Sequence, residues 1–223
     1  MNIVVISLER AKERRERVKS QLDALKLDAV IMDAVDGQIL LDSQKNKIIK
    51  NPFTGFRDGE VFKPGEIGCL MSHIKAIKIA KENKWGDVLI LEDDVILSED
   101  FNKGIKILFG MIPSNWEHIY LGGHIYFMAP PVFQPTVIPS SFKISGAYSY
   151  FLKKNIFNKV LEEMSTLELP ADDVFEKMIR EQQMKSYIFF PFLTYPVTEN
   201  SYIWNIRGNT KMHPSFKYFK NKF

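Results

Sequence analysis

The chain has 223 residues, of which 45% are hydrophobic and 26% charged. This composition excludes disordered and collagen-like chains and is typical of one globular domain with a full core. No apolar run approaches the roughly 18 residues that a membrane-spanning helix needs, and the N-terminal run of residues 3–8 is too short for a signal peptide. The single cysteine excludes an intrachain disulfide, and we expect a cytoplasmic protein.

Positive charge is concentrated at the C-terminal end. The formal net charge is +3, and residues 207–223 carry five basic side chains and no acidic one, so subtracting these five leaves a charge of −2 for the rest. A body so close to neutrality argues against a nucleic-acid partner. We expect residues 1–206 to form one domain and residues 207–223 to form a basic, aromatic tail. This tail fits either a peripheral contact with the inner face of an anionic membrane or a solvated terminus.

Hydrophobic periodicity predicts strands and helices in alternation. Short apolar runs predict strands at residues 3–7, 29–32, 88–91, 117–121, 144–152 and 187–193. Helical spacing predicts helices over residues 10–26, 64–84, 99–111, 154–164 and 170–184. The polar stretch 43–63 and the proline-rich stretch 128–141 are expected to be loops. This alternation predicts an α/β fold with a mostly parallel central sheet.

Three adjacent carboxylates, Glu92, Asp93 and Asp94, directly follow the fully apolar strand 88–91. In open α/β sheets, ligands bind outside the carboxyl ends of the strands, and hard cations prefer carboxylate oxygens and substrate phosphates. The triplet therefore predicts a Mg²⁺ or Mn²⁺ site that docks a diphosphate. If the strand continues, Glu92 and Asp94 share an orientation as metal ligands, and Asp93 faces the ribose or sugar. The alternative is an acidic turn that caps the next helix.

Two arginines lie near the start of the helix that follows the first strand. Arg10 and Arg14 are placed where guanidinium groups and helix amides reach phosphate or uracil oxygens. The alternative is a solvated helix face on which the arginines pair with Glu9, Glu13 and Glu16.

A third group of polar side chains lies one turn into the helix that begins at Pro64. Ser72, His73 and Lys75 supply a hydroxyl, an imidazole and an ammonium group that suit a nucleotide or an acceptor hydroxyl. The alternative for His73 is a buried core histidine with satisfied hydrogen bonds. The nearby Cys69 is expected to be a small buried core residue.

Asp172 and Asp173 follow Pro170 at the start of a predicted helix. One alternative is structural, because an aspartate there caps helix amides and meets the positive end of the helix dipole. The other is catalytic, because transfer of a sugar to a hydroxyl with inversion needs one carboxylate to accept the hydroxyl proton.

Taken together, these segments resemble glycosyltransferase family 25, which includes bacterial lipooligosaccharide β-galactosyltransferases and is similar to collagen β-galactosyltransferase domains. The resemblance covers about residues 2–200 and is densest up to residue 101. Four ordered motifs carry it: Ile6-Ser7-Leu8-Glu9-Arg10 with Arg14-Arg15, Asp33-Ala34-Val35-Asp36-Gly37, Pro64-Gly65-Glu66-Ile67-Gly68-Cys69 with Ser72-His73, and Leu89-Ile90-Leu91-Glu92-Asp93-Asp94-Val95. Looser matches are Tyr120-Leu121-Gly122-Gly123, Ser145-Gly146-Ala147-Tyr148 and Asp172-Asp173.

The resemblance implies a GT-A fold, a Rossmann-like α/β/α sandwich, and an inverting transfer of galactose or glucose from a UDP-sugar with Mn²⁺ or Mg²⁺. The implied acceptor is a glycan or glycolipid, such as lipooligosaccharide, or a hydroxylysine or glycan hydroxyl. By this likeness the triplet 92–94 takes the place of the metal-binding Asp-x-Asp motif, and Asp172 or Asp173 is the base. The residues implied to line the nucleotide pocket are Ser7, Arg10, Asp36 and Gly37.

The chain departs from the family pattern where acceptor specificity is expected to arise. Residues 144–147 read Ile-Ser-Gly-Ala where a Thr or His is expected beside Ala147 and Tyr148, and the loop 127–141 is individual. A late histidine that serves GT-A enzymes as a metal ligand has one counterpart, His213, whose place in the basic tail argues against that role. Two other classes fit parts of the pattern: a metal-dependent phosphoester hydrolase and a non-catalytic module that binds nucleotide-sugars.

Overall fold

The computed structural model describes residues 1–40, 64–125, 134–140 and 144–197. The whole of the predicted loop 43–63, part of the loop 128–141 and the basic tail with His213 lie outside these described residues. Among the described residues, no helix is long and apolar enough to cross a membrane.

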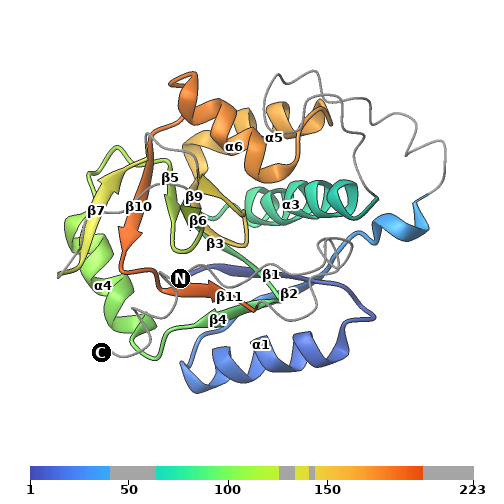
Figure 1. The fold of residues 1–223 in the computed structure, drawn as a ribbon, viewed down its shortest axis with the longest axis horizontal. Coiled ribbons are helices and arrows are strands. Elements are labelled where there is room, and N and C mark those ends of the chain that lie inside the picture. Colours follow the sequence, from blue (N-terminus) through green and yellow to red (C-terminus); the bar gives the residue numbers. More distant parts are fainter. Residues whose placement is uncertain (41–63, 126–133, 141–143, 198–223) are drawn as a thin grey trace.

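A seven-stranded sheet with the order β2-β1-β3-β9-β5-β10-β7 forms the centre of the molecule (Figure 1). Pairing is parallel for β1 with β2, β1 with β3 and β5 with β10, and antiparallel at β9 and β7, so five strands run in one direction and two in the other. The prediction of a mostly parallel sheet is confirmed. The strands are β1 (Ile3–Ser7), β2 (Val30–Asp33), β3 (Asp87–Glu92), β5 (His118–Tyr120), β7 (Thr136–Pro139), β9 (Ser149–Lys153) and β10 (Ser186–Phe190).

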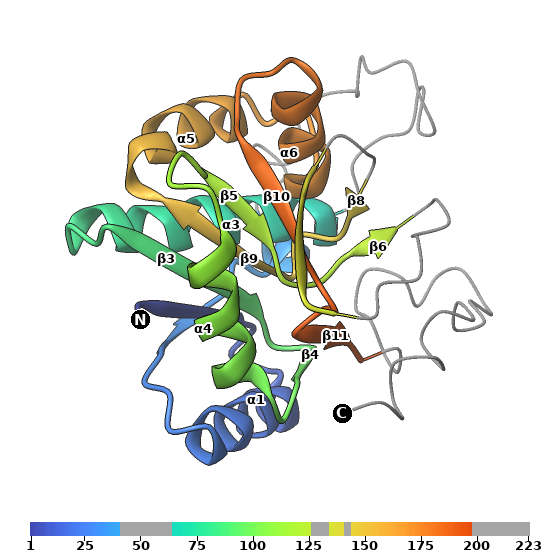
Figure 2. The same ribbon diagram turned by 90° about the vertical axis from the view of Figure 1, so that its left-hand side faces the viewer.

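Helices cover both faces of this sheet and complete an α/β/α sandwich (Figures 1 and 2). Helices α1 (Lys12–Ala24) and α4 (Phe101–Met111) pack on one face. Helices α3 (Pro64–Glu82), α5 (Phe157–Ser165) and α6 (Ala171–Arg180) pack on the other. Short elements complete the described chain: η1 (Gly37–Ile39), η2 (Lys154–Ile156), and the two-stranded pairs β4 (Val95–Leu97) with β11 (Thr194–Pro196) and β6 (His124–Ile125) with β8 (Ile144–Ser145).

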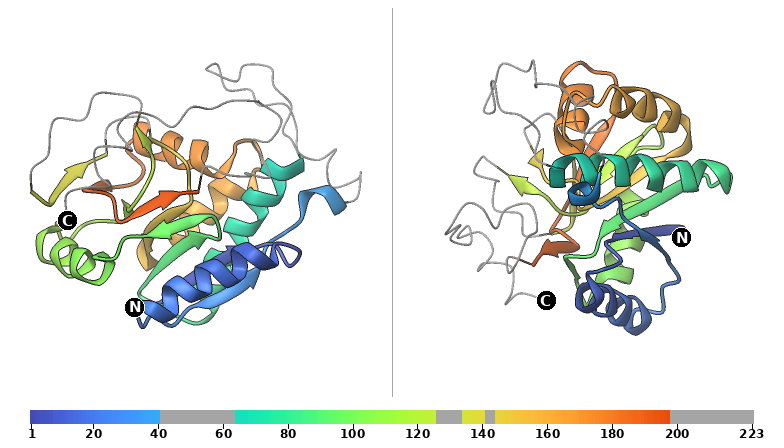
Figure 3. Two further views of the ribbon diagram at one scale, coloured as in Figure 1. Left: turned by 60° about the horizontal axis from the view of Figure 1, so that its bottom comes forward. Right: turned by 90° about the vertical axis from the view of Figure 1, so that its right-hand side faces the viewer.

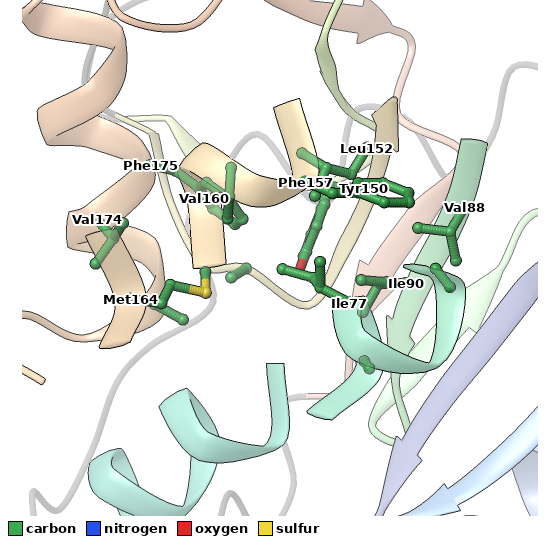
Figure 4. Close-up of a cluster of buried hydrophobic side chains, with 14 of the residues drawn as sticks. Ile77, Val88, Ile90, Tyr150, Leu152, Phe157, Val160, Met164, Val174 and Phe175 are labelled. Atoms are coloured by element: carbon green, nitrogen blue, oxygen red, sulfur yellow. The ribbon is translucent and has the colours of Figure 1, made fainter. Parts of the chain in front are cut away.

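Alternation along β3 explains how one apolar run serves two cores. Val88 and Ile90 pack into the cluster below α3, α5 and α6, and Figure 4 shows them with Tyr150 of β9. Leu89 and Leu91 pack into the opposite cluster with α1 and α4. These four apolar side chains of β3 are fully buried, as the continuous apolar run predicts for a strand covered on both faces. Each such burial contributes about 1.5–3 kcal/mol to folding.

Two predicted segments differ from the structure. The predicted strand 144–152 is divided into β8 and β9, because Gly146 between them has a φ of +94°, a conformation that interrupts a strand. The predicted loop 128–141 contains strand β7, which pairs with β10 and ends the sheet. An edge strand tolerates Pro139, since one side of its backbone needs no ladder partner. Proline content alone therefore gave the wrong assignment for residues 136–139.

Glycines let α3 approach the segment after β2 closely. A Cβ atom at Gly68 would lie 2.5 Å from the carbonyl oxygen of Val35 and 2.6 Å from the amide nitrogen of Gly37. A Cβ at Gly37 would overlap the backbone of Pro64. This contact sets the position of the α3 face that carries Cys69 and His73.

Gly68→Ala is expected to destabilise the protein by about 2 kcal/mol, because backbone atoms cannot move aside as a flexible side chain does. Denaturant unfolding measures the change. Gly110→Ala is the matched control: Gly110 lies in α4 with no heavy atom within 4 Å of the added Cβ, so its stability should stay equal or rise by about 0.5 kcal/mol. Equal unfolding midpoints for Gly68→Ala and the unsubstituted chain would contradict the close packing.

Candidate functional site

The carboxyl ends of β1, β2 and β3 meet at one edge of the sheet. Ser7 is in register with Asp33, and Ile6 with Glu92, because the three strands are parallel. Helices α1 and α3 lie on opposite sides of this edge (Figure 3). This is where ligands bind in open α/β sheets.

Strand alternation separates the members of the acidic triplet. Glu92 continues the series of Val88 and Ile90, so its side chain turns toward α3. The side chain of Asp93 turns to the other face, where it contacts Ser7 at the end of β1 and Arg14 of α1. The expected shared orientation of Glu92 and Asp94 required a continuing strand, but β3 ends at Glu92 and a turn leads into β4. The alternative of a cap for the next helix is also wrong, since β4 follows the triplet.

Asp93 is held by two groups that favour its charge. Its Oδ2 accepts a hydrogen bond from Ser7 Oγ at 2.7 Å, and its Oδ1 accepts one from Arg14 Nη1 at 3.3 Å. Arg17 Nη2 donates to the Asp93 carbonyl oxygen at 3.3 Å. Burial raises the pKa of Asp93, and the contacts with Ser7 and Arg14 oppose that rise.

The carboxylate of Asp94 has a more distant cationic partner than that of Asp93. Arg14 Nη1 lies 3.5 Å from its Oδ2, and no closer cation is recorded among the described residues. Burial, and then the charge of Glu92, raise the pKa of Asp94 to about 7, with Arg14 opposing this. Among the described residues, the triplet places three carboxylates close together near the guanidinium of Arg14, and such a group of oxygen atoms suits a divalent cation.

Glu92 meets two side chains of α3. His73 Nε2 lies 3.3 Å from Glu92 Oε1, and Cys69 Sγ lies 3.8 Å from the same oxygen. His73 is completely buried, and its Nδ1 is 2.9 Å from the hydroxyl of Tyr150. The carboxylate can only accept, so Nε2 carries the proton in this arrangement and the Tyr150 hydroxyl donates to Nδ1.

Cys69 lies at the site and only partly inside the core, so the prediction of a buried core residue is wrong. Burial raises the pKa of its thiol well above the usual range, and the charges of Glu92, Asp172 and Asp94 raise it further. The negative charges of Asp172 in α6 and of Glu92 and Asp94 at the end of β3 therefore all influence the Cys69 thiol. The sequence separates Asp172 from Glu92 by 80 positions, and the fold brings them together.

Asp172 and Asp173 lie in the first turn of α6, whose N-cap is Pro170. Asp172 Oδ2 accepts a hydrogen bond from the Gly146 amide at 3.1 Å, which ties α6 to the segment between β8 and β9. Burial raises the pKa of the Tyr120 hydroxyl, and the charges of Asp172 and Asp173 raise it further. Because Gly146 is close to Tyr148, whose carbonyl oxygen accepts from the Glu92 amide, the bond to Gly146 places Asp172 beside the segment that is bound to the acidic strand end.

The remaining predicted residues surround the end of β2. Arg10 Nε pairs with Asp36 Oδ2 at 2.7 Å, and Asp36 also caps η1 by accepting from the Gln38 amide at 3.0 Å. This pairing and its capping bond lower the pKa of Asp36, whereas burial raises it. Lys75 Nζ donates to the Asp33 carbonyl oxygen at 2.8 Å.

The hydroxyl of Ser72 makes two hydrogen bonds within the protein. It accepts from the Val35 amide at 2.8 Å and donates to the Gly68 carbonyl oxygen at 2.6 Å. The hydroxyl therefore links α3 to the segment that follows β2, next to the close approach of Gly37.

Sequence reasoning missed two polar residues of this region. Arg15 Nη2 donates to Asp33 Oδ1 at 2.6 Å and to the Ser7 carbonyl oxygen at 3.0 Å. Tyr150 contacts His73 from a strand that follows it by 77 positions. For Cys69 a signal was present, because Cys69 and His73 are four residues apart and thus share one face of a helix.

The fold is similar to that of a solved glycosyltransferase. A glycosyltransferase involved in the glycosylation of the major capsid of PBCV-1 aligns with a TM-score of 0.53 over 90% of this chain and 95% of that chain. The sequence identity is 12%, so the likeness is one of fold. The implied GT-A class, an α/β/α sandwich with a central mostly parallel sheet, is confirmed.

The sequence identifies the family within this class. The model of glycosyltransferase family 25 (LPS biosynthesis protein) matches residues 1–131, more than half of the chain, and the chain belongs to this family. Human procollagen galactosyltransferase 2 is 34% identical over 126 residues, which are 54% of this chain and 20% of that protein. The human inactive glycosyltransferase 25 family member 3 is 31% identical over 126 residues, 54% of this chain and 21% of that protein. The chain thus matches about a fifth of the length of these two relatives.

Proposed function

We propose that the protein is an inverting hexosyltransferase that moves galactose or glucose from a UDP-sugar to a hydroxyl of a glycan or glycolipid. The observation that carries this proposal is the arrangement of carboxylates around residues 146–148: Asp172 accepts from the Gly146 amide, and Glu92, the first residue of the acidic triplet, donates its amide to the Tyr148 carbonyl oxygen. Such a site supplies separate carboxylates for a cation and for an acceptor proton. Membership of family 25 supports the reaction class.

The strand end is proposed to bind the donor. Glu92 and Asp94 would hold the divalent cation, which fits the burial and the neighbouring Glu92 charge that raise the pKa of Asp94. When bound, this Mn²⁺ or Mg²⁺ would stabilise the negative charge that develops on the leaving diphosphate. Ser7 and Arg14 position Asp93, which is proposed to orient toward the ribose or sugar.

The nucleotide is proposed to extend along the end of β2. Arg10, Asp36 and Gly37 lie there, and Ser72 and Lys75 of α3 contact the same segment, whereas His73 of that helix faces Glu92 at the proposed cation site. Arg10 is partly exposed, so its guanidinium remains accessible to a phosphate or uracil oxygen.

Asp172 is the proposed base, with Asp173 as the alternative. The hydrogen bond from the Gly146 amide uses one carboxylate oxygen of Asp172 and fixes the side chain, and the second oxygen can accept the proton of an acceptor hydroxyl. The hydroxyl oxygen then bonds to the anomeric carbon as the bond to the diphosphate breaks on the opposite face, which gives inversion.

The acceptor is proposed to approach over residues 144–148, which lie between the base and the strand end. Lipooligosaccharide, a hydroxylysine or another glycan hydroxyl fits the family. A cytoplasmic enzyme whose residues 207–223 contact the inner face of a membrane would meet a glycolipid acceptor there.

A donor screen tests the proposal. The purified chain is incubated with a set of UDP-hexoses, with Mn²⁺, with Mg²⁺ or with EDTA, and UDP release is measured. We expect one UDP-hexose to be turned over in the presence of a divalent cation, and EDTA to abolish this. Release of inorganic phosphate from phosphoesters instead of UDP would favour a hydrolase. Binding of UDP-sugar without any turnover would favour a non-catalytic module.

A further inference from the structure

We infer that Cys69, His73 and Glu92 form a binding site for one divalent cation of the zinc class. The three side chains each offer one ligand atom, and these atoms lie within 4.8 Å of one another. This set combines sulfur, nitrogen and oxygen, unlike the oxygen ligands proposed for the donor cation. The inference shares Glu92 with the proposed function and otherwise does not depend on sugar transfer.

Two elements bring the three ligands together. Cys69 and His73 are four residues apart in α3 and therefore lie on one face of that helix. Glu92 is the last residue of β3 and follows Val88 and Ile90 on the side of the sheet that α3 covers. The packing of α3 on β3 thus holds the ligands in a fixed arrangement.

The distances between ligand atoms fit a tetrahedral ion. Zinc bonds of about 2.3 Å to sulfur and about 2.0–2.2 Å to nitrogen and oxygen place neighbouring ligand atoms about 3.3–3.6 Å apart. His73 Nε2 and Glu92 Oε1 are 3.3 Å apart, and Cys69 Sγ and Glu92 Oε1 are 3.8 Å apart. Small side-chain rotations would bring all three atoms to bonding distance of one cation.

Tyr150, the hydrogen-bond partner of His73, gives independent support for a metal site. A histidine that binds a metal through one ring nitrogen is held by a hydrogen bond to the other. His73 is completely buried and its Nδ1 lies 2.9 Å from the Tyr150 hydroxyl, so Nε2 is aimed at Glu92. With a cation on Nε2, Nδ1 carries the proton and donates to Tyr150.

The charge around the site favours a cation, and the ligand types select its class. The Glu92 carboxylate lies 3.8 Å from the Cys69 sulfur and brings negative charge to the site, and the thiol would release its proton to solvent as a metal–sulfur bond forms. Thiolate and imidazole ligands favour Zn²⁺ and Co²⁺ over Mg²⁺.

Cobalt absorption tests this site, because the chain has a single cysteine. Co²⁺ is added to the purified full chain without nucleotide, and the near-ultraviolet thiolate-to-cobalt charge-transfer band is recorded. We expect a band that saturates at one Co²⁺ per chain and that one equivalent of Zn²⁺ removes. Absence of the band in a chain shown to be folded by circular dichroism would overturn the inference.

Three variants test the site: one replaces a ligand, one replaces the partner of a ligand, and one is a control outside the ligand set. Cys69→Ser keeps the side-chain size, and it should abolish the band and raise the Kd for Zn²⁺ about tenfold or more. Tyr150→Phe keeps the ring and removes the hydroxyl, and it should raise this Kd about tenfold. Asp94→Asn should keep the band, since Asp94 is not in the ligand set; its loss in a folded Asp94→Asn variant would refute that set.

These measurements separate the two proposals. A chain that turns over UDP-hexose with Mn²⁺ and shows no cobalt–thiolate band retains the proposed function and loses this site. A chain that shows the band and turns over no UDP-sugar retains the site and loses the proposed function.

Discussion

Asp94→Asn is expected to lower turnover of the UDP-hexose by about 10³-fold while it stabilises the cation-free protein at neutral pH. Asp94 is a proposed ligand of the donor cation, so the variant removes charge stabilisation of the leaving diphosphate, an effect of about 10²–10³-fold or more. The same carboxylate is buried beside Glu92, which raises its pKa to about 7. Function and stability therefore make opposite demands on this side chain.

The sign of the pH dependence follows from this raised pKa. In the unfolded chain the Asp94 carboxyl has its ordinary pKa of 3.8, whereas in the folded protein its pKa is raised to about 7 and it stays protonated up to that pH. The stability linked to the bound proton is complete below pH 4 and is lost as the pH rises toward 7. Asparagine does not ionise, so the Asp94→Asn variant does not lose stability as the pH rises. Above pH 7 it should therefore be more stable than the unsubstituted chain by about 1–3 kcal/mol.

Urea unfolding in EDTA at pH 4.5, 6 and 8 measures this difference, alongside UDP release in Mn²⁺ at pH 8. Asp23→Asn is the control, because Asp23 is exposed on α1 and its substitution should change neither quantity. A stability difference between Asp94→Asn and the unsubstituted chain that does not grow with pH would contradict the raised pKa. Undiminished turnover in Asp94→Asn would remove Asp94 from the cation site.

Asp172→Asn is expected to reduce sugar transfer by about 10²–10⁴-fold and to leave UDP affinity unchanged. Asparagine keeps an oxygen that accepts the hydrogen bond from the Gly146 amide, so the tie between α6 and the segment before β9 is preserved. Only the capacity to accept a proton from the acceptor is lost. Transfer is measured with the acceptor present, and UDP affinity by calorimetry in Mn²⁺.

Asp173→Asn is the matched variant for this experiment. Both aspartates lie in the first turn of α6 and meet the same helix dipole, so they differ mainly in which one faces the acidic strand end. We expect Asp173→Asn to change transfer less than tenfold. The reverse order of the two effects would assign the base to Asp173, and no effect from either would exclude both.

Much of the architecture could be predicted from local patterns. The apolar run of β3 and the helical period of α3 depend on neighbours in the sequence, and the structure confirms both elements. The strand 144–152 and the segment 136–139 were predicted less well, because one glycine with positive φ and one sheet edge decide them. Both are features of the folded chain rather than of residue preference.

The candidate site was predictable as a region. Three carboxylates after a buried strand indicate a site at the sheet edge, and the structure places Ser7, Arg14 and His73 around that same edge. The expected grouping of Glu92 with Asp94 depended on a continuing strand, and β3 ends at Glu92, two residues before Asp94.

The sequence by itself determined the family, the alternation of strands and helices, and the identity of the acidic residues at the strand end. The tertiary structure alone decided which partner each carboxylate meets: Glu92 faces His73 and Cys69, Asp93 faces Arg14, and α6 brings in Asp172. The physical reason is that strand alternation sends successive side chains to opposite faces of a sheet. Which helix covers each face depends on packing between segments up to 80 positions apart, and no local pattern in the sequence records that.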